Sequence, residues 1–177
     1  MKIIELFETI NVNSSSFKKW FGDSKIVDKS GKPLKLYRGL NGTHIQNTTM
    51  EPRNGYAIFF TTSPYMAATY ANPPEKGNWN DAGAIFQVYI KANKLYEFPT
   101  RETKYGKSFD KLEFDNLAKK LKPNEALVVR NIIDVGPRCD NNIDPDKLWS
   151  YPADVYAIGK GTEIKSAISD FTWKYSK

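Results

Sequence analysis

The chain has very little of the chemistry that metal sites and disulfides use. It contains one cysteine, Cys139, and one histidine, His44, among 177 residues. A single cysteine excludes an intramolecular disulfide, and a zinc site needs about four ligands, most of them cysteine or histidine. We therefore interpret both side chains as structural or incidental and expect no metal cofactor.

Long apolar runs are also missing. No stretch approaches the ~20 consecutive apolar residues that a membrane-spanning helix requires. The first residues, Met1 to Glu8, are too few and too acidic for a secretory signal. We expect a cytoplasmic protein with no membrane partner.

What remains is the composition of a folded domain with excess positive charge. The hydrophobic fraction of 40%, with 10 Tyr, 10 Phe and 4 Trp, argues against disorder, and the length fits one domain. We assign residues 1–13 to an N-terminal segment and residues 14–177 to a single domain. A net charge of +6 and a pI near 9.2 favour an anionic partner. Because the basic residues are scattered, a solvated surface is the simpler interpretation.

Short helical and strand patterns alternate along the chain, which predicts an α+β fold. A helix should follow Ser14–Ser16 and end at Gly22, a second should run from Pro64 to Tyr70 with Ser63 as its cap, and Ser108 should cap a third. Strands are expected at residues 35–40, 56–62, 84–90, 95–98, 126–133 and 154–158, with 164–168 as a closing edge strand and 26–27 paired with 34–37 in a hairpin.

Three of these segments carry unusual polar groups. The first, Lys35–Leu40, ends on Arg38 beside Gly39. The second carries aromatic residues into the hydroxyl run Thr61-Thr62-Ser63, and the helix after it places Tyr70 nearby. These groups suit a flat cationic ring attached to a diphosphate, and a nicotinamide dinucleotide is such a molecule. An acidic residue that opens a late strand, Asp154, completes the set.

The order and spacing of these motifs resemble the ADP-ribosyltransferase fold, in particular the small bacterial and phage domains found alone or inside phage polyvalent proteins. Phe17–Gly39 is similar to the opening signature of that family, and Asn131–Gly136 and Glu163–Ala167 are similar to its later strands. The resemblance runs from about residue 17 to residue 168. It implies a split β-sheet core flanked by short helices.

The chain mixes the site motifs of the two branches of this family. The branch of the poly-ADP-ribose polymerases has His, Tyr and Glu, and the branch of many bacterial toxins has Arg, Ser-Thr-Ser and Glu. Arg38 takes the first toxin-like position, and Thr61-Thr62-Ser63 approximates Ser-Thr-Ser. Tyr70, however, matches the stacking tyrosine of the polymerase-like branch, and the acid is Asp154 in place of Glu.

The resemblance implies cleavage of the bond between ribose and nicotinamide in NAD, through a transition state with positive charge on the ribose. Asp154 would bind the ribose 2′-hydroxyl and face that charge. Arg38 would bind a phosphate or ribose, and Gly39 would let the backbone approach the nicotinamide amide. A surface salt bridge and an ordinary turn are the simpler interpretations of these two residues.

Aromatic and hydroxyl side chains would complete the NAD site. Tyr70 would stack on the nicotinamide ring, with Phe59 on its other side. Thr61 and Ser63 would brace the carboxylate or the ribose. Core packing is the simpler interpretation of Phe59, and capping of the next helix is the simpler interpretation of Ser63.

Two positions depart from the family pattern. Aspartate is one methylene shorter than glutamate, so Glu163 is kept as a reserve for the acid. Pro152 stands where toxin-like relatives that modify arginine or glutamine often carry Glu or Gln. Proline cannot engage an acceptor in that way, which disfavours arginine and leaves nucleic acid open as an acceptor.

The sequence thus predicts an NAD-dependent mono-ADP-ribosyltransferase that needs no metal. It would transfer ADP-ribose to a macromolecule, either protein or DNA or RNA, as a phage effector or toxin with an antitoxin or host target as partner. If phage-encoded, it would act in the host cytoplasm. The alternatives are a catalytically inactive NAD-binding module of the same fold and a nucleic-acid-binding protein that uses exposed Tyr and Trp as stacking platforms.

Overall fold

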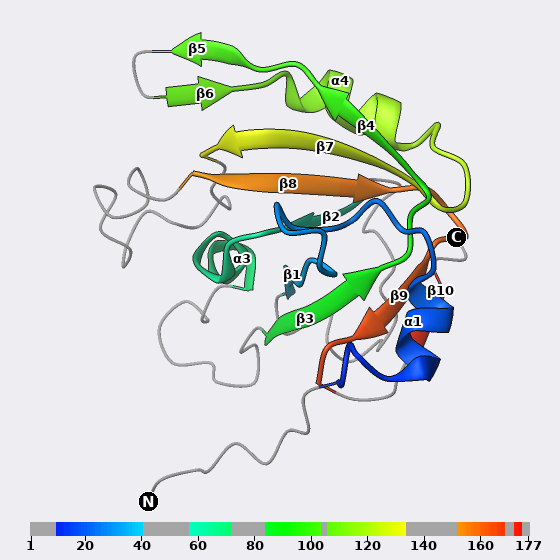
Figure 1. Cartoon of the computed structure of the whole chain (residues 1–177). Helices are drawn as coiled ribbons and strands as arrows, with labels where there is room; N and C mark the ends of the chain where they lie inside the picture. Colours follow the sequence, from blue (N-terminus) through cyan, green and yellow to red (C-terminus); the bar gives the residue numbers. More distant parts are fainter. Residues whose placement is uncertain are drawn as a thin grey trace, which may run out of the picture.

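The computed structural model describes residues 10–40, 57–71, 84–103, 106–133, 152–168 and 172–174. These residues form an α+β structure with three helices and one ten-stranded sheet (Figure 1). The described helices are α1 (Ser15–Phe21), α3 (Pro64–Ala71) and α4 (Lys111–Ala118). The strands are β1 (Leu36–Leu40), β2 (Ile58–Thr61), β3 (Ala84–Ile90), β4 (Lys94–Phe98), β5 (Arg101–Thr103), β6 (Gly106–Ser108), β7 (Glu125–Ile132), β8 (Ala153–Ile158), β9 (Glu163–Ser166) and β10 (Thr172–Lys174).

The sheet has the strand order β10-β9-β3-β1-β2-β8-β7-β6-β5, and β4 also pairs with β7. The pairs that β7 makes with β4 and with β6 are parallel, and the others are antiparallel. The strands β1, β2 and β8, which come from distant parts of the chain, therefore lie side by side in the middle of the sheet (Figure 1).

Alternate residues of the central strands point to opposite faces of the sheet, and each face has its own core. On one face, Leu36, Phe60 and Tyr156 pack with Ile26, which comes from the segment between α1 and β1. We call this side the loop face. On the other, the helix face, residues of β2, β7 and β8 pack against Met66 of α3 and Phe114 of α4.

Local sequence signals explain the ends of the first two described helices. Ser14 caps α1 by accepting a hydrogen bond from the amide of Phe17, and Gly22 ends it with a φ of 55°. The Ser63 hydroxyl accepts a hydrogen bond from the amide of Met66 in the first turn of α3, as predicted. The predicted cap of α4 is wrong: Asp110 caps this helix, because residues 106–108 form β6.

The predicted strands are found with small shifts at their ends, and β3 has the predicted bounds. The predicted hairpin at residues 26–37 reduces to one bridge between Val27 and Pro33. The segment at 164–168 is not an edge strand, because β10 pairs along its outer side. Neither β10 nor the β5–β6 hairpin was predicted, since three-residue strands carry too short a pattern.

Several predictions fall outside the described residues. They concern the residues His44 and Cys139, the end of the Asn131–Gly136 motif and the start of the N-terminal segment. The described end of that segment packs on the body of the domain: the amide of Ile10 donates to the carbonyl of Ala167, and Ile10 lies against the core cluster beneath α1.

Candidate functional site

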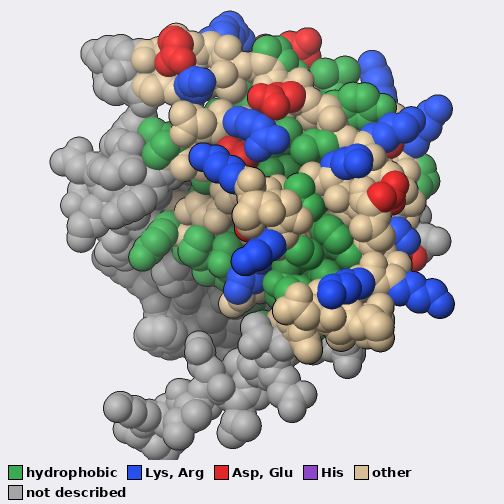
Figure 2. Space-filling model, in the orientation of Figure 1, with side chains coloured by type: hydrophobic (Ala, Val, Ile, Leu, Met, Phe, Trp, Pro, Cys, Tyr) green, Lys and Arg blue, Asp and Glu red, His purple; other side chains and the backbone are tan. Residues whose placement is uncertain are grey.

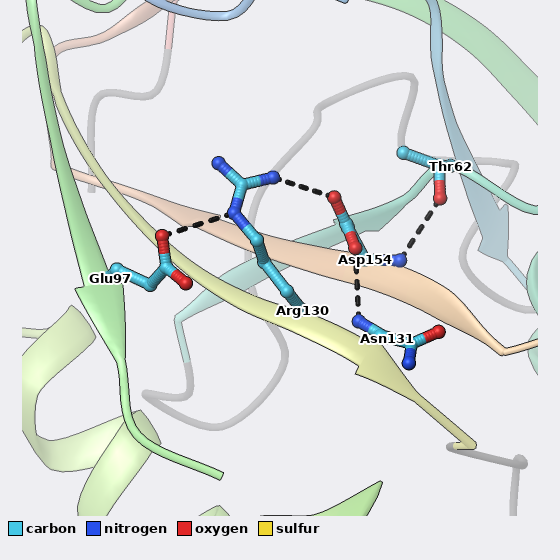
Figure 3. A network of polar contacts seen from close by, with 5 residues as sticks. All are labelled: Thr62, Glu97, Arg130, Asn131 and Asp154. Atoms are coloured by element: carbon cyan, nitrogen blue, oxygen red, sulfur yellow. Dashed lines mark hydrogen bonds and ion pairs between the residues drawn. The ribbon is translucent and has the colours of Figure 1, made fainter. Parts of the chain in front are cut away.

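The hydroxyl run at the end of β2 meets the acidic residue at the start of β8. The amide of Thr62 donates to the carbonyl of Asp154 at 3.0 Å, and the amide of Asp154 donates to the Thr62 hydroxyl at 3.0 Å (Figure 3). These two bonds extend the pairing of β2 with β8 beyond Thr61 and Val155. They fix the backbone from which the Asp154 side chain projects on the loop face.

The sheet is weakly joined between β1 and β2. Strand β1 pairs with β3 along all five of its residues, whereas its pairing with β2 is limited to Tyr37 and Thr61. Next to that pair, Nη1 of Arg38 donates to the carbonyl of Phe59 at 3.0 Å. The guanidinium carbon lies 5.8 Å from the centre of the Phe60 ring, within the range of a cation–π contact. The half-buried Arg38 side chain therefore lies where the ladder between the two strands is interrupted.

The carboxylate of Asp154 is held by two donors from β7. Nη1 of Arg130 donates to Oδ2 at 2.8 Å, and the amide of Asn131 donates to Oδ1 at 3.0 Å (Figure 3). Arg130 also donates from Nε to Oε2 of Glu97 on β4, at 3.1 Å. One cation thus lies between two carboxylates, and 25% of the Asp154 side chain remains accessible to solvent.

A β-bulge in β7 produces this geometry. The register of β7 against β8 shifts between Val129 and Ile132, and Asn131 has a φ of 55°. This left-handed conformation is uncommon for a residue other than glycine. Bulges commonly re-aim groups at the ends of sheets, and this one turns the Asn131 amide toward Asp154. Backbone strain that persists beside a polar cluster is typical of functional sites.

The charges of this cluster shift the pKa values of the buried neighbour Tyr156 and of Arg130 within the cluster. Burial and the nearby Asp154 carboxylate raise the pKa of Tyr156, which lies two residues along β8. Burial alone would lower the pKa of Arg130, but the hydrogen bond to Glu97 and the charge of Asp154 outweigh it, and the pKa is raised.

Three of the predicted site residues face the opposite side of the sheet. Phe59 stacks on Phe114 with ring centres 5.8 Å apart. The buried Thr61 hydroxyl donates to Sδ of Met66 at 3.3 Å. At Gly39, a Cβ atom would lie 1.8 Å from the carbonyl oxygen of Ala67, so glycine is required for α3 to pack on β1. These residues hold α3 and α4 on the helix face and do not join the Asp154 cluster.

Of the remaining predicted residues, Ser63 caps α3, and the other three lie at separate places. Tyr70 lies near the end of α3 and is 39% exposed. Glu163 lies on β9, with β3, β1 and β2 between it and Asp154. Its carboxylate accepts a hydrogen bond from Nε1 of Trp20 at 2.9 Å and so fastens α1 to the sheet. Pro152 is exposed directly before β8.

Sequence reasoning missed four members of the Asp154 cluster: Thr62, Glu97, Arg130 and Asn131. Two signals were present. Arg130 interrupts an apolar strand, as Arg38 does, and strand alternation puts Thr61 and Thr62 on opposite faces. The register of β2 with β8 then places Thr62 on the face of Asp154. The left-handed conformation of Asn131 had no such signal.

Within the described ranges, no three His, Cys, Asp or Glu side chains are grouped so that they could hold a metal ion. None of the helices in these ranges combines the length and apolar character needed to cross a membrane. Comparison of the chain with protein-family models, with curated proteins and with solved structures finds no match in any of the three.

Proposed function

We propose that this protein is an NAD-dependent mono-ADP-ribosyltransferase with the split-sheet core of that fold. The observation that carries the proposal is the adjacency of β1, β2 and β8. It brings Arg38 and Asp154 to one face of the sheet, on strands separated by β2, so that two strand spacings, roughly 10 Å, lie between these strands. The register that pairs Tyr37 with Thr61 places Arg38 opposite Phe60, whereas Asp154 lies opposite Thr62, so the two residues are also offset by two positions along the strands. The interrupted pairing between β1 and β2 beside Arg38 is the further feature that a split sheet requires.

The two charged residues suit the two ends of the reaction. The planar guanidinium of Arg38 is suited to a phosphate of the dinucleotide. A carboxylate has about four sites that accept hydrogen bonds, and the two recorded bonds to Asp154 leave room for a ribose hydroxyl. When the bond between ribose and nicotinamide breaks, its electron pair leaves with nicotinamide, and the carboxylate stabilises the positive charge left on the ribose. A lone pair of the acceptor then forms the new bond to the ribose.

The proposal keeps Tyr70 as the partner of the nicotinamide ring, which requires the dinucleotide to reach α3 on the helix face from Arg38 and Asp154 on the loop face. Tyr70 is partly exposed on α3, whose backbone lies against Gly39 of β1. Phe59 is assigned to the core, because its ring is stacked on Phe114. The proposal therefore keeps one stacking partner for the ring where the sequence suggested two.

The acceptor is proposed to be a macromolecule, with protein and nucleic acid both open. Exposed lysines are frequent in α1 and the segment that follows it: Lys18, Lys19, Lys25, Lys29 and Lys32. Figure 2 shows lysine and arginine side chains spread across the face of the molecule rather than gathered in one patch. Such a surface attracts an anionic macromolecule without selecting a sequence.

The test is incubation of the purified protein with NAD labelled in its ADP-ribose part, together with lysate protein, RNA or DNA. We expect transfer of label to one pool, and loss of that transfer in Asp154→Ala. The matched control is Glu102→Ala, which removes a carboxylate exposed on β5. Transfer that persists in Asp154→Ala but is lost in Glu163→Ala would show that the acid is Glu163 on β9 and not Asp154 on β8. The absence of both label and free nicotinamide with every pool would overturn the proposal.

One observation favours a second candidate, an NAD-binding module without catalysis. The ion pair with Arg130 neutralises part of the charge that Asp154 would direct at the ribose. Saturable NAD binding by calorimetry, with no release of nicotinamide, would support this candidate over the transferase.

A further inference from the structure

We propose that Arg130 is a positioning residue for Asp154, and that Glu97 and the bulge at Asn131 complete its action. This inference rests on the proposed function, because it assigns Asp154 the role of the acid. It concerns residues to which the motif comparison gave no role. The geometry of the network carries it.

The two oxygens of the carboxylate are held from different directions. Arg130 donates to Oδ2 from its side chain, and Asn131 donates to Oδ1 from its backbone. Two donors on two oxygens fix the plane of a carboxylate, whereas one donor would leave it free to turn. Asp154 can therefore present its remaining acceptor sites in one direction only.

Arg130 is in turn held by Glu97. Its Nη1 and Nε atoms bond to carboxylates on β8 and β4, the strands that flank β7 in this region. The guanidinium thus ties three neighbouring strands together (Figure 3). Because a guanidinium is rigid and planar, fixing Nε on Glu97 also sets the direction in which Nη1 points.

Charge balance gives Glu97 a second role. A lone cation at 2.8 Å would cancel much of the field that Asp154 directs at a developing positive charge. Glu97 shares that cation, so the cluster of two carboxylates and one guanidinium keeps an excess of negative charge. The arrangement fixes the aspartate while the cluster as a whole keeps a net negative charge.

This arrangement also accounts for an aspartate at this position. A short side chain reaches less far than glutamate but has fewer rotatable bonds to fix. The bulge brings the Asn131 amide to 3.0 Å from Oδ1, so the shorter side chain reaches this donor. The bulge and the short aspartate side chain therefore act together to fix the carboxylate.

The test compares nicotinamide release from NAD by the full chain, its Arg130→Ala variant and the control variant Arg101→Ala. Arg101 is the matched control because it is exposed on β5 and its ion pair with Asp110 spans 3.8 Å. We expect Arg130→Ala to lower kcat by about 100-fold, the loss typical of a misplaced reacting group, with KM for NAD changed less than about twofold. Guanidinium at millimolar concentration, far below the molar range in which it denatures proteins, should restore at least a tenth of the lost rate. Arg101→Ala should keep the wild-type kcat, and added guanidinium should not change that rate.

A second variant guards against a folding defect. Arg130→Lys keeps the charge but lacks the rigid fork, and it should retain the melting temperature of the wild type while kcat falls by about 10-fold. A wild-type rate in Arg130→Ala, or a loss that guanidinium does not restore, would overturn the positioning role while leaving the transferase intact. If the wild type itself releases no nicotinamide, the proposed function fails, and this inference fails with it.

Discussion

On the loop face of the sheet, Asp154 is held by polar groups of β7 and of Thr62 directly after β2, whereas on the helix face Gly39, Phe59 and Thr61 are packed beneath α3 and α4. Neighbouring residues of one motif are divided between the two faces, as Arg38 and Gly39 are and as Thr62 and Thr61 are. Because side chains alternate along a strand, neighbours in a motif serve opposite faces. The loop face carries Arg38 and the Asp154 cluster, and the helix face holds α3 and α4 on the sheet.

The strongest test of this contrast is Gly39→Ala. The new methyl group would meet backbone atoms of α3, which cannot move aside as a flexible side chain can. We expect a loss of about 3 kcal/mol in the free energy of unfolding, the upper range for overpacking. Urea denaturation measures it.

Gly31→Ala is the comparison variant for Gly39→Ala. Gly31 has a φ of 79° but open space around its Cβ position, so that change should cost only the ~1 kcal/mol of a left-handed backbone. If Gly39→Ala kept full stability and lost NAD binding, Gly39 would belong to the nicotinamide site instead.

The aromatic pair sharpens the same contrast. Phe59→Ala should lower the free energy of unfolding by about 2 kcal/mol, less than a fully buried phenylalanine, and leave KM for NAD unchanged. Tyr70→Ala should have the reverse effect, because its side chain is partly exposed: little loss of stability, and a KM raised about 10-fold through lost stacking. Denaturation curves and initial rates of nicotinamide release give both quantities. If Phe59→Ala raised KM for NAD and Tyr70→Ala instead lowered the free energy of unfolding, Phe59 and not Tyr70 would contact the nicotinamide ring.

The two threonines offer a smaller but stricter comparison. Thr62→Val removes the acceptor of the Asp154 amide and should lower kcat several-fold by loosening the backbone beneath the carboxylate. Thr61→Val removes a bond to Met66 and should cost about 1 kcal/mol of stability without changing kcat. Equal effects on kcat would mean that the two faces do not act separately.

The smallest expected effect is a dependence on alkaline pH. Burial and the Asp154 charge raise the pKa of Tyr156 above its ordinary value of 10.0. The folded protein therefore holds this proton more tightly than the unfolded chain. The corresponding stability is complete below the unfolded pKa and is lost as pH rises through the folded pKa.

Tyr156→Phe should make the fall in unfolding free energy above about pH 10 shallower, by at most about 1.4 kcal/mol per pH unit. Tyr89, whose pKa is raised chiefly by burial, remains as an internal reference. An unchanged slope would mean that Tyr156 does not titrate with folding in this range.

The sequence predicts features that depend on neighbouring residues better than contacts between residues far apart in the chain. Ser63 and Pro64 correctly predicted the start of α3. Ser14 and Gly22 correctly predicted the two ends of α1. Such predictions succeed because a helix cap depends on residues only a few positions apart. The bridging of Asp154 by Arg130 could not be derived in this way. It depends on how β7 pairs with β8, and a bulge shifts that register.

The candidate site shows the same division. Asp154 was singled out because it opens a strand, and strand pairing brings it beside the hydroxyl run. Alternation was available to separate Thr61 from Thr62 but was not applied to them. The packing of α3 on Gly39 depends on how the helix lies across the sheet, and a single sequence holds no record of that.

The most direct test of the account is nicotinamide release from NAD by the wild type and by Asp154→Asn, which keeps the shape of the side chain and removes its charge. We predict measurable release by the wild type and a fall in kcat of about 100- to 1,000-fold in the variant, comparable to the loss of one preorganised group that stabilises transition-state charge. NAD binding by the variant should persist. Equal rates for the two proteins, or no release by either, would contradict the central role of Asp154.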